Sequence, residues 1–291
     1  MEILRTCAEL REWSRYERNN GKNTIGLVPT MGALHTGHVS LIRASHASVA
    51  FTAVSIFVNP TQFGPNEDFA RYPRSFDADC ALAQAEGADA IFAPSVDEMY
   101  PAGAATFVEV EELGHRLDGV SRPIHFRGVA TVVAKLLSAS EADRAFFGQK
   151  DAAQVAVLRR MATDLRFATE IVVCPIVRDP DGLALSSRNV YLSVEERAQA
   201  LSLSRAVRNA EALYAAGERS ASALISSARE LLTAGPAIRI DYIELVDWAT
   251  LLPVEIAVAG SLFAVAAWVG TTRLIDNTVF AEGADSRKSS A

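Results

Sequence analysis

Two histidines, His35 and His38, stand three residues apart, shortly after an apolar run that ends at Pro29. A helix that begins near Gly37 would place both imidazoles on one face, because residues three apart are neighbours on a helix. The N–H groups at a helix N-terminus lack helical partners and, together with the helix dipole, favour an anion. Gly32 would let a ligand approach the backbone closely. We therefore predict a polyphosphate site in which both imidazoles stabilise developing charge.

A second candidate element is the turn-rich stretch 183–189, LALSSRN. The hydroxyls of Ser186 and Ser187 can donate to phosphate oxygens, and Arg188 offers a planar, permanently charged fork. Taken alone, the stretch is equally typical of a capped turn with an exposed arginine. The H-x-G-H pattern of residues 35–38 is similar to the HIGH motif of nucleotidylyltransferases and class I aminoacyl-tRNA synthetases. Since that pattern is present, the stretch 183–189 resembles the mobile KMSKS-type loop of the same superfamily.

Two further segments carry polar side chains beside apolar runs. Lys150 follows FFGQ and can act as a point charge on phosphate, although a solvated surface lysine is the simpler interpretation. Asp151 is a reasonable helix N-cap, and Gln154, one turn further on, would reach a polar substrate. Gln62 follows the second predicted strand, and ligands of open parallel sheets bind beyond the carboxyl ends of strands. Simple turn chemistry is the alternative for Gln62.

A local positive patch comes from Arg122, His125 and Arg127 in the segment SRPIHFRG. These residues would either help to attract ATP or form ion pairs across a subunit interface. The sequence does not separate the two alternatives.

Composition limits the class of protein. The 291 residues are 49% hydrophobic and 22% charged, as in a globular protein with a substantial core, and the net charge of −7 argues against a large nucleic-acid footprint. The N-terminal residues form no apolar signal segment, and the most apolar stretch, 262–269, is too short to span a bilayer, so we expect a cytoplasmic protein with no membrane partner. No zinc-type spacing or disulfide framework is formed by Cys7, Cys80 and Cys174.

Apolar periodicity predicts the elements that position these residues. Strands are expected at 24–28, 51–58, 88–93 and 170–174, and helices at 38–46, 76–86, 128–137 and 151–163. Continuous apolar strands that alternate with helices indicate an α/β fold with a parallel sheet covered on both faces. Helices at 194–216 and 220–234, followed by strands at 239–246, 262–269 and 273–277, indicate a smaller α+β domain. We predict domains at 1–176 and 177–282, and a disordered tail at 283–291.

Eight segments together resemble the pantothenate synthetase family. They run in the order typical of that family from residue 28 to residue 277: VPTMGALHTGH, VSIFVNPTQF, ARYPRSF, IFAPSVDEMYP, SRPIHFRGV, FFGQKD, DGLALSSRNVYLS and AAWVGTTRLIDN. The resemblance implies a Rossmann-like domain with a smaller C-terminal α+β domain that acts as a lid, and a homodimer. It also implies a reaction in which ATP and pantoate give pantoyl adenylate and pyrophosphate, after which β-alanine displaces AMP to give pantothenate.

The resemblance also implies roles for individual residues. Pantoate would be bound by Gln62 and Gln154, with Gln62 also near β-alanine, and His38 would be the proton donor. We expect His35, Lys150, Ser186, Ser187 and Arg188 to surround the phosphates, with Mg²⁺ held mainly by nucleotide and water rather than by protein ligands. The implied ATP site comprises Met31, Gly32, Ala33, Leu34, His35, Thr36, Gly37, His38, Gly148, Gln149, Lys150, Asp151, Val177, Leu185, Ser186, Ser187 and Arg188.

The chain departs from the family pattern at Gln149, where the family usually has Glu, and at Ala152 and Ala153. Lys150, Asp151 and Gln154 remain, so activity is expected to persist. Two rival functions stay open at this point. A nucleotidylyltransferase would release a stable adenylated product instead of AMP. A regulatory relative would bind ATP without turnover, and only Gln149 favours it. An aminoacyl-tRNA synthetase is disfavoured by length and acidity.

Overall fold

The computed structural model describes residues 1–65, 67–235 and 237–282, and the chain divides into two compact units. Unit 1 comprises Met1–Gln149 and Val157–Val177, and unit 2 comprises Lys150–Ala156 and the chain from Arg178 onward. The tail predicted at 283–291 lies outside the described residues. The domain division at residue 176 and the lid role of residues 177–282 remain predictions.

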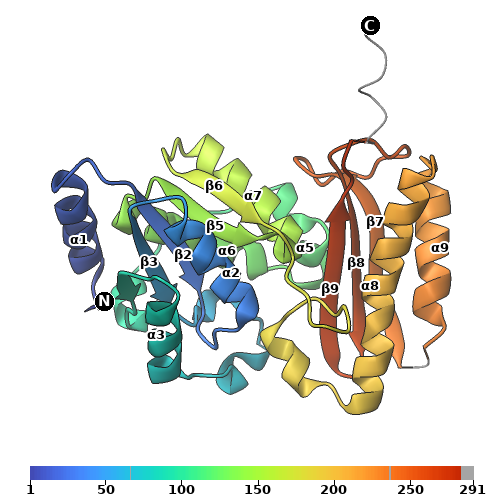
Figure 1. Ribbon diagram of the computed structural model, residues 1–291, viewed down its shortest axis with the longest axis horizontal. Helices are drawn as coiled ribbons and strands as arrows, with labels where there is room; N and C mark the ends of the chain where they lie inside the picture. The colour runs from blue at the N-terminus through green and yellow to red at the C-terminus, as the bar shows by residue number, and fades with distance from the viewer. Residues whose placement is uncertain (66, 236, 283–291) are drawn as a thin grey trace, which may run out of the picture. The chain divides into compact units, whose positions relative to one another are not determined.

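Unit 1 is built on a parallel sheet of six strands in the order β1-β4-β3-β2-β5-β6 (Figure 1). The predicted α/β class with a parallel sheet is therefore confirmed, although the sequence did not predict the first and fifth strands. The central strand β2 is buried along almost its whole length, which explains its unbroken apolar sequence. The strands are β1 (Glu2–Leu4), β2 (Ile25–Thr30), β3 (Phe51–Ile56), β4 (Ala90–Phe92), β5 (Arg144–Gly148) and β6 (Glu170–Cys174).

Helices flank this sheet. Helix α2 packs over a core of strand side chains that includes Val28, Val54 and Phe146, and α6 is buried along most of its length. Thr6 begins α1 with a complete capping box to Glu9. The helices are α1 (Cys7–Asn19), α2 (Thr36–His46), α3 (Phe76–Ala85), α4 (Val96–Met99), α5 (Asp118–Ser121), α6 (His125–Ser140) and α7 (Ala152–Asp164), the last of which begins in unit 2 and continues in unit 1.

The strand order shows where unit 1 can bind a ligand. From β2 the chain crosses to β3 on one side, whereas β5 pairs with β2 on the other side. In open α/β sheets, ligands bind beyond the carboxyl ends of strands at the point where the direction of winding changes. The residues that follow β2 and β5, 31–38 and 149, leave the sheet at this edge.

Unit 2 has an antiparallel sheet in the order β7-β8-β9, with two helices packed on it (Figure 1). Its elements are α8 (Val194–Ala215), α9 (Ala221–Thr233), β7 (Ile238–Asp247), β8 (Ser261–Val269) and β9 (Thr272–Val279). The core joins α8 and α9 to the sheet through side chains such as Val207, Leu224 and Phe263. The predicted smaller α+β fold is confirmed. Within the described residues, no helix has the length and apolar character that crossing a membrane requires.

Candidate active site

A tight turn after β2 leads into α2. Thr30 Oγ1 donates to the Ser55 carbonyl at 2.6 Å and accepts from Gly32 N–H at 3.2 Å. Gly32 and Ala33 then take left-handed conformations, with φ of +82° and +50°. A Cβ on Gly32 would lie 3.2 Å from Cγ2 of Ile56, so both conformation and space favour glycine there. This turn delivers the chain to His35.

Asp79 of α3 holds the turn from outside. Its Oδ2 accepts from Ala33 N–H at 2.9 Å and its Oδ1 accepts from Leu34 N–H at 2.8 Å, while Ser75 Oγ donates to Oδ1 at 3.1 Å. Asp79 is only 3% exposed. Sequence reasoning missed this residue, because an acid in the first turn of a helix is adequately explained by the helix dipole.

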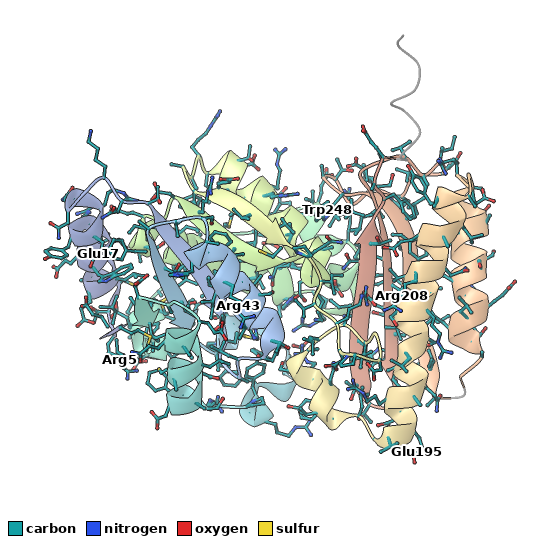
Figure 2. All side chains as sticks on the ribbon, in the orientation of Figure 1. Arg5, Glu17, Arg43, Glu195, Arg208 and Trp248 are labelled. Carbon is teal, nitrogen blue, oxygen red and sulfur yellow. The ribbon has the colours of Figure 1, made fainter. Side chains whose placement is uncertain are left out.

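A second contact ties α2 to α3 on the surface. Arg43 of α2 is labelled among the side chains of Figure 2. Its guanidinium donates to both carboxylate oxygens of Glu86, at 2.5 and 2.9 Å, just after the end of α3. Since Arg43 is largely exposed, this pair contributes little on its own. Asp79, in contrast, bonds the turn itself through the N–H groups of Ala33 and Leu34.

His35 and His38 are brought together at the start of α2. Their ring centroids lie 4.1 Å apart. Gly37 N–H donates to His35 Nδ1 at 3.1 Å, and His35 N–H donates to His38 Nδ1 at 3.3 Å, which completes a capping box made of histidines. Because each Nδ1 accepts a hydrogen bond, the proton of each neutral ring resides on Nε2. Both imidazoles are thus fixed as Nε2–H donors.

Gln62 lies beside Met31, so the structure also brings these two predicted residues together. Gln62 is in the short 3-10 helix η1 (Pro60–Gln62), and its Nε2 donates to Met31 Sδ at 3.1 Å. Asn59 Nδ2 donates to Gln62 Oε1 at 3.0 Å, and Tyr100 Oη donates to Asn59 Oδ1 at 2.8 Å. Sequence reasoning missed Asn59 and Tyr100. Their contacts fix which end of the Gln62 amide is the donor.

The backbone of Gln62 is held by part of the positive patch. Its carbonyl accepts from Arg122 Nη2 at 3.3 Å and from His125 Nδ1 at 3.0 Å. Burial, and then the charge of Arg122, lower the pKa of His125 to about 4, so its ring is neutral at pH 7 and donates from Nδ1. Burial raises the pKa of Glu67, but two hydrogen bonds from Arg122, at 2.7 and 2.6 Å, outweigh it and hold that pKa below its usual value.

Arg127 has different partners. Its guanidinium lies over the Phe107 ring, 3.9 Å from the ring centroid, and 4.0 Å from a carboxylate oxygen of Glu109. Both alternatives given for the patch, attraction of ATP and a subunit interface, remain predictions for Arg127.

Lys150 belongs to unit 2, whereas Gly148 and Gln149 belong to unit 1. The Lys150 ammonium lies 3.7 Å from Asp151 Oδ1. The Lys150 carbonyl accepts from Asn277 Nδ2 at 2.9 Å, and the Ala152 carbonyl accepts from Trp248 Nε1 at 3.0 Å. The segment that carries Lys150 is thus bound at two backbone positions, to β9 and to the residue that follows β7. Gln154 is half-buried one turn further along α7.

The serine-rich loop is an ordered turn within unit 2. Ser186 begins the 3-10 helix η5 (Ser187–Tyr191), and its Oγ accepts from Arg188 N–H at 3.3 Å. Asn189 Nδ2 donates to the Ala184 carbonyl at 3.1 Å. The Ser186 hydroxyl still has its own hydrogen to donate. The predicted capped turn is present, and it does not conflict with a role in phosphate binding.

The candidate residues fall into two sets. In unit 1, the segment 31–38 and Gln62 are joined by direct contacts, while Val177 ends that unit. In unit 2, Lys150, Asp151, Gln154 and the loop 185–188 share one compact unit. A parallel sheet with H-x-G-H after its central strand, together with a lysine and a loop of hydroxyls and arginine in the second unit, defines an ATP-using enzyme of the HIGH-motif superfamily.

Comparisons with known proteins identify the family. A family model described as pantoate-beta-alanine ligase matches residues 2–279. The pantothenate synthetase of Acidobacterium capsulatum is 62% identical over 97% of this chain and 98% of its own length. The crystal structure of pantothenate synthetase from Thermus thermophilus is 46% identical, with a TM-score of 0.90 over 96% of this chain and 99% of that one.

A third relative was solved with ligands. The pantoate-beta-alanine ligase from Francisella tularensis, complexed with beta-gamma ATP and beta-alanine, is 32% identical with a TM-score of 0.76, over 96% of this chain and 97% of that one. The chain belongs to the pantoate–β-alanine ligase family. It is an AMP-forming C–N ligase that condenses pantoate with β-alanine through pantoyl adenylate. The predicted family and enzyme class are confirmed, and the two rival functions are set aside.

Proposed function

We propose that the candidate residues divide the two chemical steps between them as follows. In the first step a pantoate carboxylate oxygen attacks the α-phosphorus of ATP in line, and the bond from that phosphorus to pyrophosphate breaks. Positioning and charge stabilisation dominate such displacements at phosphorus. The observation that carries the proposal is the histidine capping box, which leaves Nε2–H as the donor of both His35 and His38.

Phosphate binding rests on donors of three kinds. His35 and His38 donate hydrogen bonds from Nε2, and His38, which the family resemblance makes the donor, directs its Nε2–H at the leaving pyrophosphate. Lys150 supplies a point charge. The hydroxyls and guanidinium of Ser186, Ser187 and Arg188 add directional hydrogen bonds. The remaining residues of the proposed ATP site line the nucleotide: Met31, Gly32, Ala33, Leu34, Thr36, Gly37, Gly148, Gln149, Asp151, Val177 and Leu185.

Pantoate is bound by Gln62 and Gln154. The fixed amide of Gln62 supports this assignment, because Asn59 occupies its oxygen and leaves Nε2 to donate. Nε2 carries two hydrogens, so it can keep its contact with Met31 and still donate to a carboxylate or hydroxyl of the substrate.

In the second step the neutral amine of β-alanine attacks the acyl carbon of pantoyl adenylate. The carbon–oxygen bond to AMP breaks, AMP leaves with the bridging oxygen, and the new amide nitrogen loses a proton to solvent. Gln62 lies near the incoming amine in this account. Exclusion of water from the site protects the adenylate until the amine arrives.

Mg²⁺ enters with the nucleotide, as MgATP. The ion prefers oxygen ligands and keeps several waters, so the triphosphate supplies its main contacts. The half-exposed carboxylate of Asp151, 3.7 Å from the Lys150 ammonium, fits an outer contact to a water of the hydrated ion.

We also propose a cytoplasmic homodimer, from the family resemblance, and sedimentation of the purified chain measures its oligomeric state.

A component-omission assay tests the proposed chemistry. Purified protein is incubated with ATP, Mg²⁺, pantoate and β-alanine, and AMP and pantothenate are quantified with each component left out in turn. We expect equal amounts of AMP and pantothenate, and only in the complete mixture. Formation of ADP in place of AMP, or of a stable adenylated product, would refute the proposed route.

A further inference from the structure

The last strand of unit 2 carries two buried polar residues that the reaction does not use directly. Asp276 and Asn277 of β9 are 2% and 3% exposed, and both belong to the segment TTRLIDN. We propose that Asp276 and Asn277 are positioning residues, an inference that rests on the proposed roles of Lys150 and the loop 185–188. They hold both phosphate-binding elements of unit 2 on one strand, so that the two elements keep a fixed spacing.

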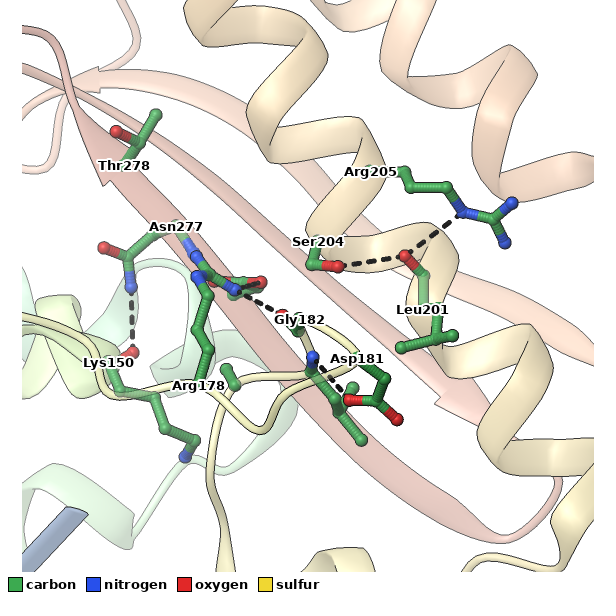
Figure 3. A network of polar contacts seen from close by, with 12 residues as sticks. Lys150, Arg178, Asp181, Gly182, Leu201, Ser204, Arg205, Asn277 and Thr278 are labelled. Carbon is green, nitrogen blue, oxygen red and sulfur yellow. Dashed lines mark hydrogen bonds and ion pairs between the residues drawn. The ribbon is translucent and has the colours of Figure 1, made fainter. Parts of the chain in front are cut away.

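Asn277 forms the contact to Lys150. Its Nδ2 donates to the Lys150 carbonyl at 2.9 Å (Figure 3), and Trp248 Nε1 donates to the Ala152 carbonyl, two residues further on, at 3.0 Å. These bonds join residues 127 and 96 positions apart in the chain. The backbone from which the Lys150 ammonium extends is thereby fixed at its own carbonyl and again two residues further on.

Asp276 forms the contact to the loop. Its two carboxylate oxygens accept from Arg178 at 2.6 and 2.9 Å. Arg178 Nη1 also donates to the Gly182 carbonyl at 3.2 Å (Figure 3). Arg178 pairs with Ala184 through an antiparallel bridge, and Asp179 N–H donates to the Leu183 carbonyl at 2.8 Å. The hairpin 178–184, which leads into Ser186–Arg188, is thus fixed at its base.

The two contacts meet on a rigid support. The backbone N–H of Asn277 donates to Asp276 Oδ1 at 2.8 Å, so the Asp276 carboxylate also holds the backbone that carries Asn277. Both residues pair with β8, opposite Val265 and Ala264, and that strand is almost wholly buried. Consecutive strand residues point to opposite faces, which lets one short stretch of β9 hold two separate elements. A change at Asn277 should therefore alter the position of Lys150 while leaving the core of the unit in place.

A double-mutant cycle between Asn277→Ala and Lys150→Ala tests the inference, with single-turnover pyrophosphate release from ATP and pantoate as the readout. We expect Lys150→Ala to slow adenylation roughly 10²–10³-fold. Asn277→Ala should slow it about 10- to 100-fold, because an error of about 1 Å in placement has an effect of this size. In the Lys150→Ala background, Asn277→Ala should slow adenylation by less than about 3-fold, because the effect of Asn277 passes through Lys150.

Two further variants keep the test interpretable. Trp248→Phe keeps an aromatic ring and removes only the Nε1–H donor to the Ala152 carbonyl. It should slow adenylation in the same way as Asn277→Ala but less, and it replaces Asn277→Ala in the test if the Asn277→Ala protein folds poorly. Asn209→Ala is the matched control in the same unit, because it removes an amide that donates to Ser227 Oγ at 2.7 Å. We expect its adenylation rate to equal that of the parent protein. The KM for β-alanine should not change in any of the four variants.

Each outcome has one meaning. Multiplicative effects of Asn277→Ala and Lys150→Ala would overturn the positioning role of Asn277. A fall in Tm for Asn277→Ala and Trp248→Phe with unchanged adenylation would assign a purely structural role, and would also overturn it. A Lys150→Ala protein with parental turnover would instead refute the proposed function of Lys150, and the inference with it.

Discussion

Replacing Asp79 by Asn is the most informative single change at the turn before the histidines. The substitution keeps the size of the side chain but replaces one carboxylate oxygen by an NH₂ group. At present the two oxygens accept from the N–H groups of Ala33 and Leu34 at 2.9 and 2.8 Å. In the variant one of these buried donors faces another donor.

The expected cost follows from that lost acceptor. A buried backbone donor left without a partner costs about 1–3 kcal/mol. For a protein of this size we expect Tm to fall by about 2–10 °C. The turn also sets the position of the His35–His38 pair, so we expect adenylation to slow about 10- to 100-fold, with the KM for β-alanine unchanged.

The assay combines a thermal melt with single-turnover pyrophosphate release in the absence of β-alanine. Asp77→Asn is the matched control, because Asp77 is exposed in the same first turn of α3 and the chemical change is identical. It should alter neither quantity. A reduced Tm with parental adenylation would show that the turn does not control the histidines. No change in either quantity would show that the two hydrogen bonds contribute nothing.

Three further predictions address the site. His38→Ala should slow adenylation roughly 10²–10³-fold, because it removes one donor to developing charge; parental turnover in folded protein would exclude that role. The pKa of His125 in the folded protein is about 4, compared with 6.5 for an unperturbed imidazole, so folding favours the neutral ring. The folded state therefore has the full benefit of neutral His125 above pH 6.5. As pH falls towards 4, the free energy of unfolding decreases by roughly 3 kcal/mol. In His125→Asn, whose Nδ2–H can replace Nδ1–H on the Gln62 carbonyl, Tm should depend less steeply on pH between 6.5 and 4, and an unchanged dependence would contradict the assignment. Chelation of Mg²⁺ should abolish pyrophosphate release and added Mg²⁺ should restore it, whereas release at full rate in chelator would remove the ion from the account.

Much of the fold could be predicted because its elements carry strong local signals. The strand at 170–174 has the predicted bounds. The helix predicted at 194–216 starts where expected, because a capping box at Ser193 marks its start, and it ends one residue earlier. Strand β1 was missed because it has only three residues, two of them exposed. Strand β5 was missed because its sequence RAFFG holds an apolar run of only three residues, and its pairing with β2 and β6 is not visible in the sequence.

The candidate site could be predicted only in part. The spacing of His35 and His38 indicates a shared helix face, and the structure brings the rings together. Their tautomer could not be predicted, because a capping box normally uses Ser or Thr with Glu or Gln, whereas histidines fill both positions here. Asp79 and Asn277 act across 46 and 127 residues of sequence, and no local pattern encodes contacts of that range.

Oxygen transfer from pantoate to AMP tests the central claim most directly. The protein is incubated with ATP, Mg²⁺, β-alanine and pantoate labelled with ¹⁸O in its carboxylate, and AMP is analysed by mass spectrometry. If the carboxylate attacks the α-phosphorus and the amine then breaks the acyl–oxygen bond, each AMP carries one ¹⁸O from pantoate. AMP without label, or label recovered in inorganic phosphate, would contradict the acyl-adenylate route.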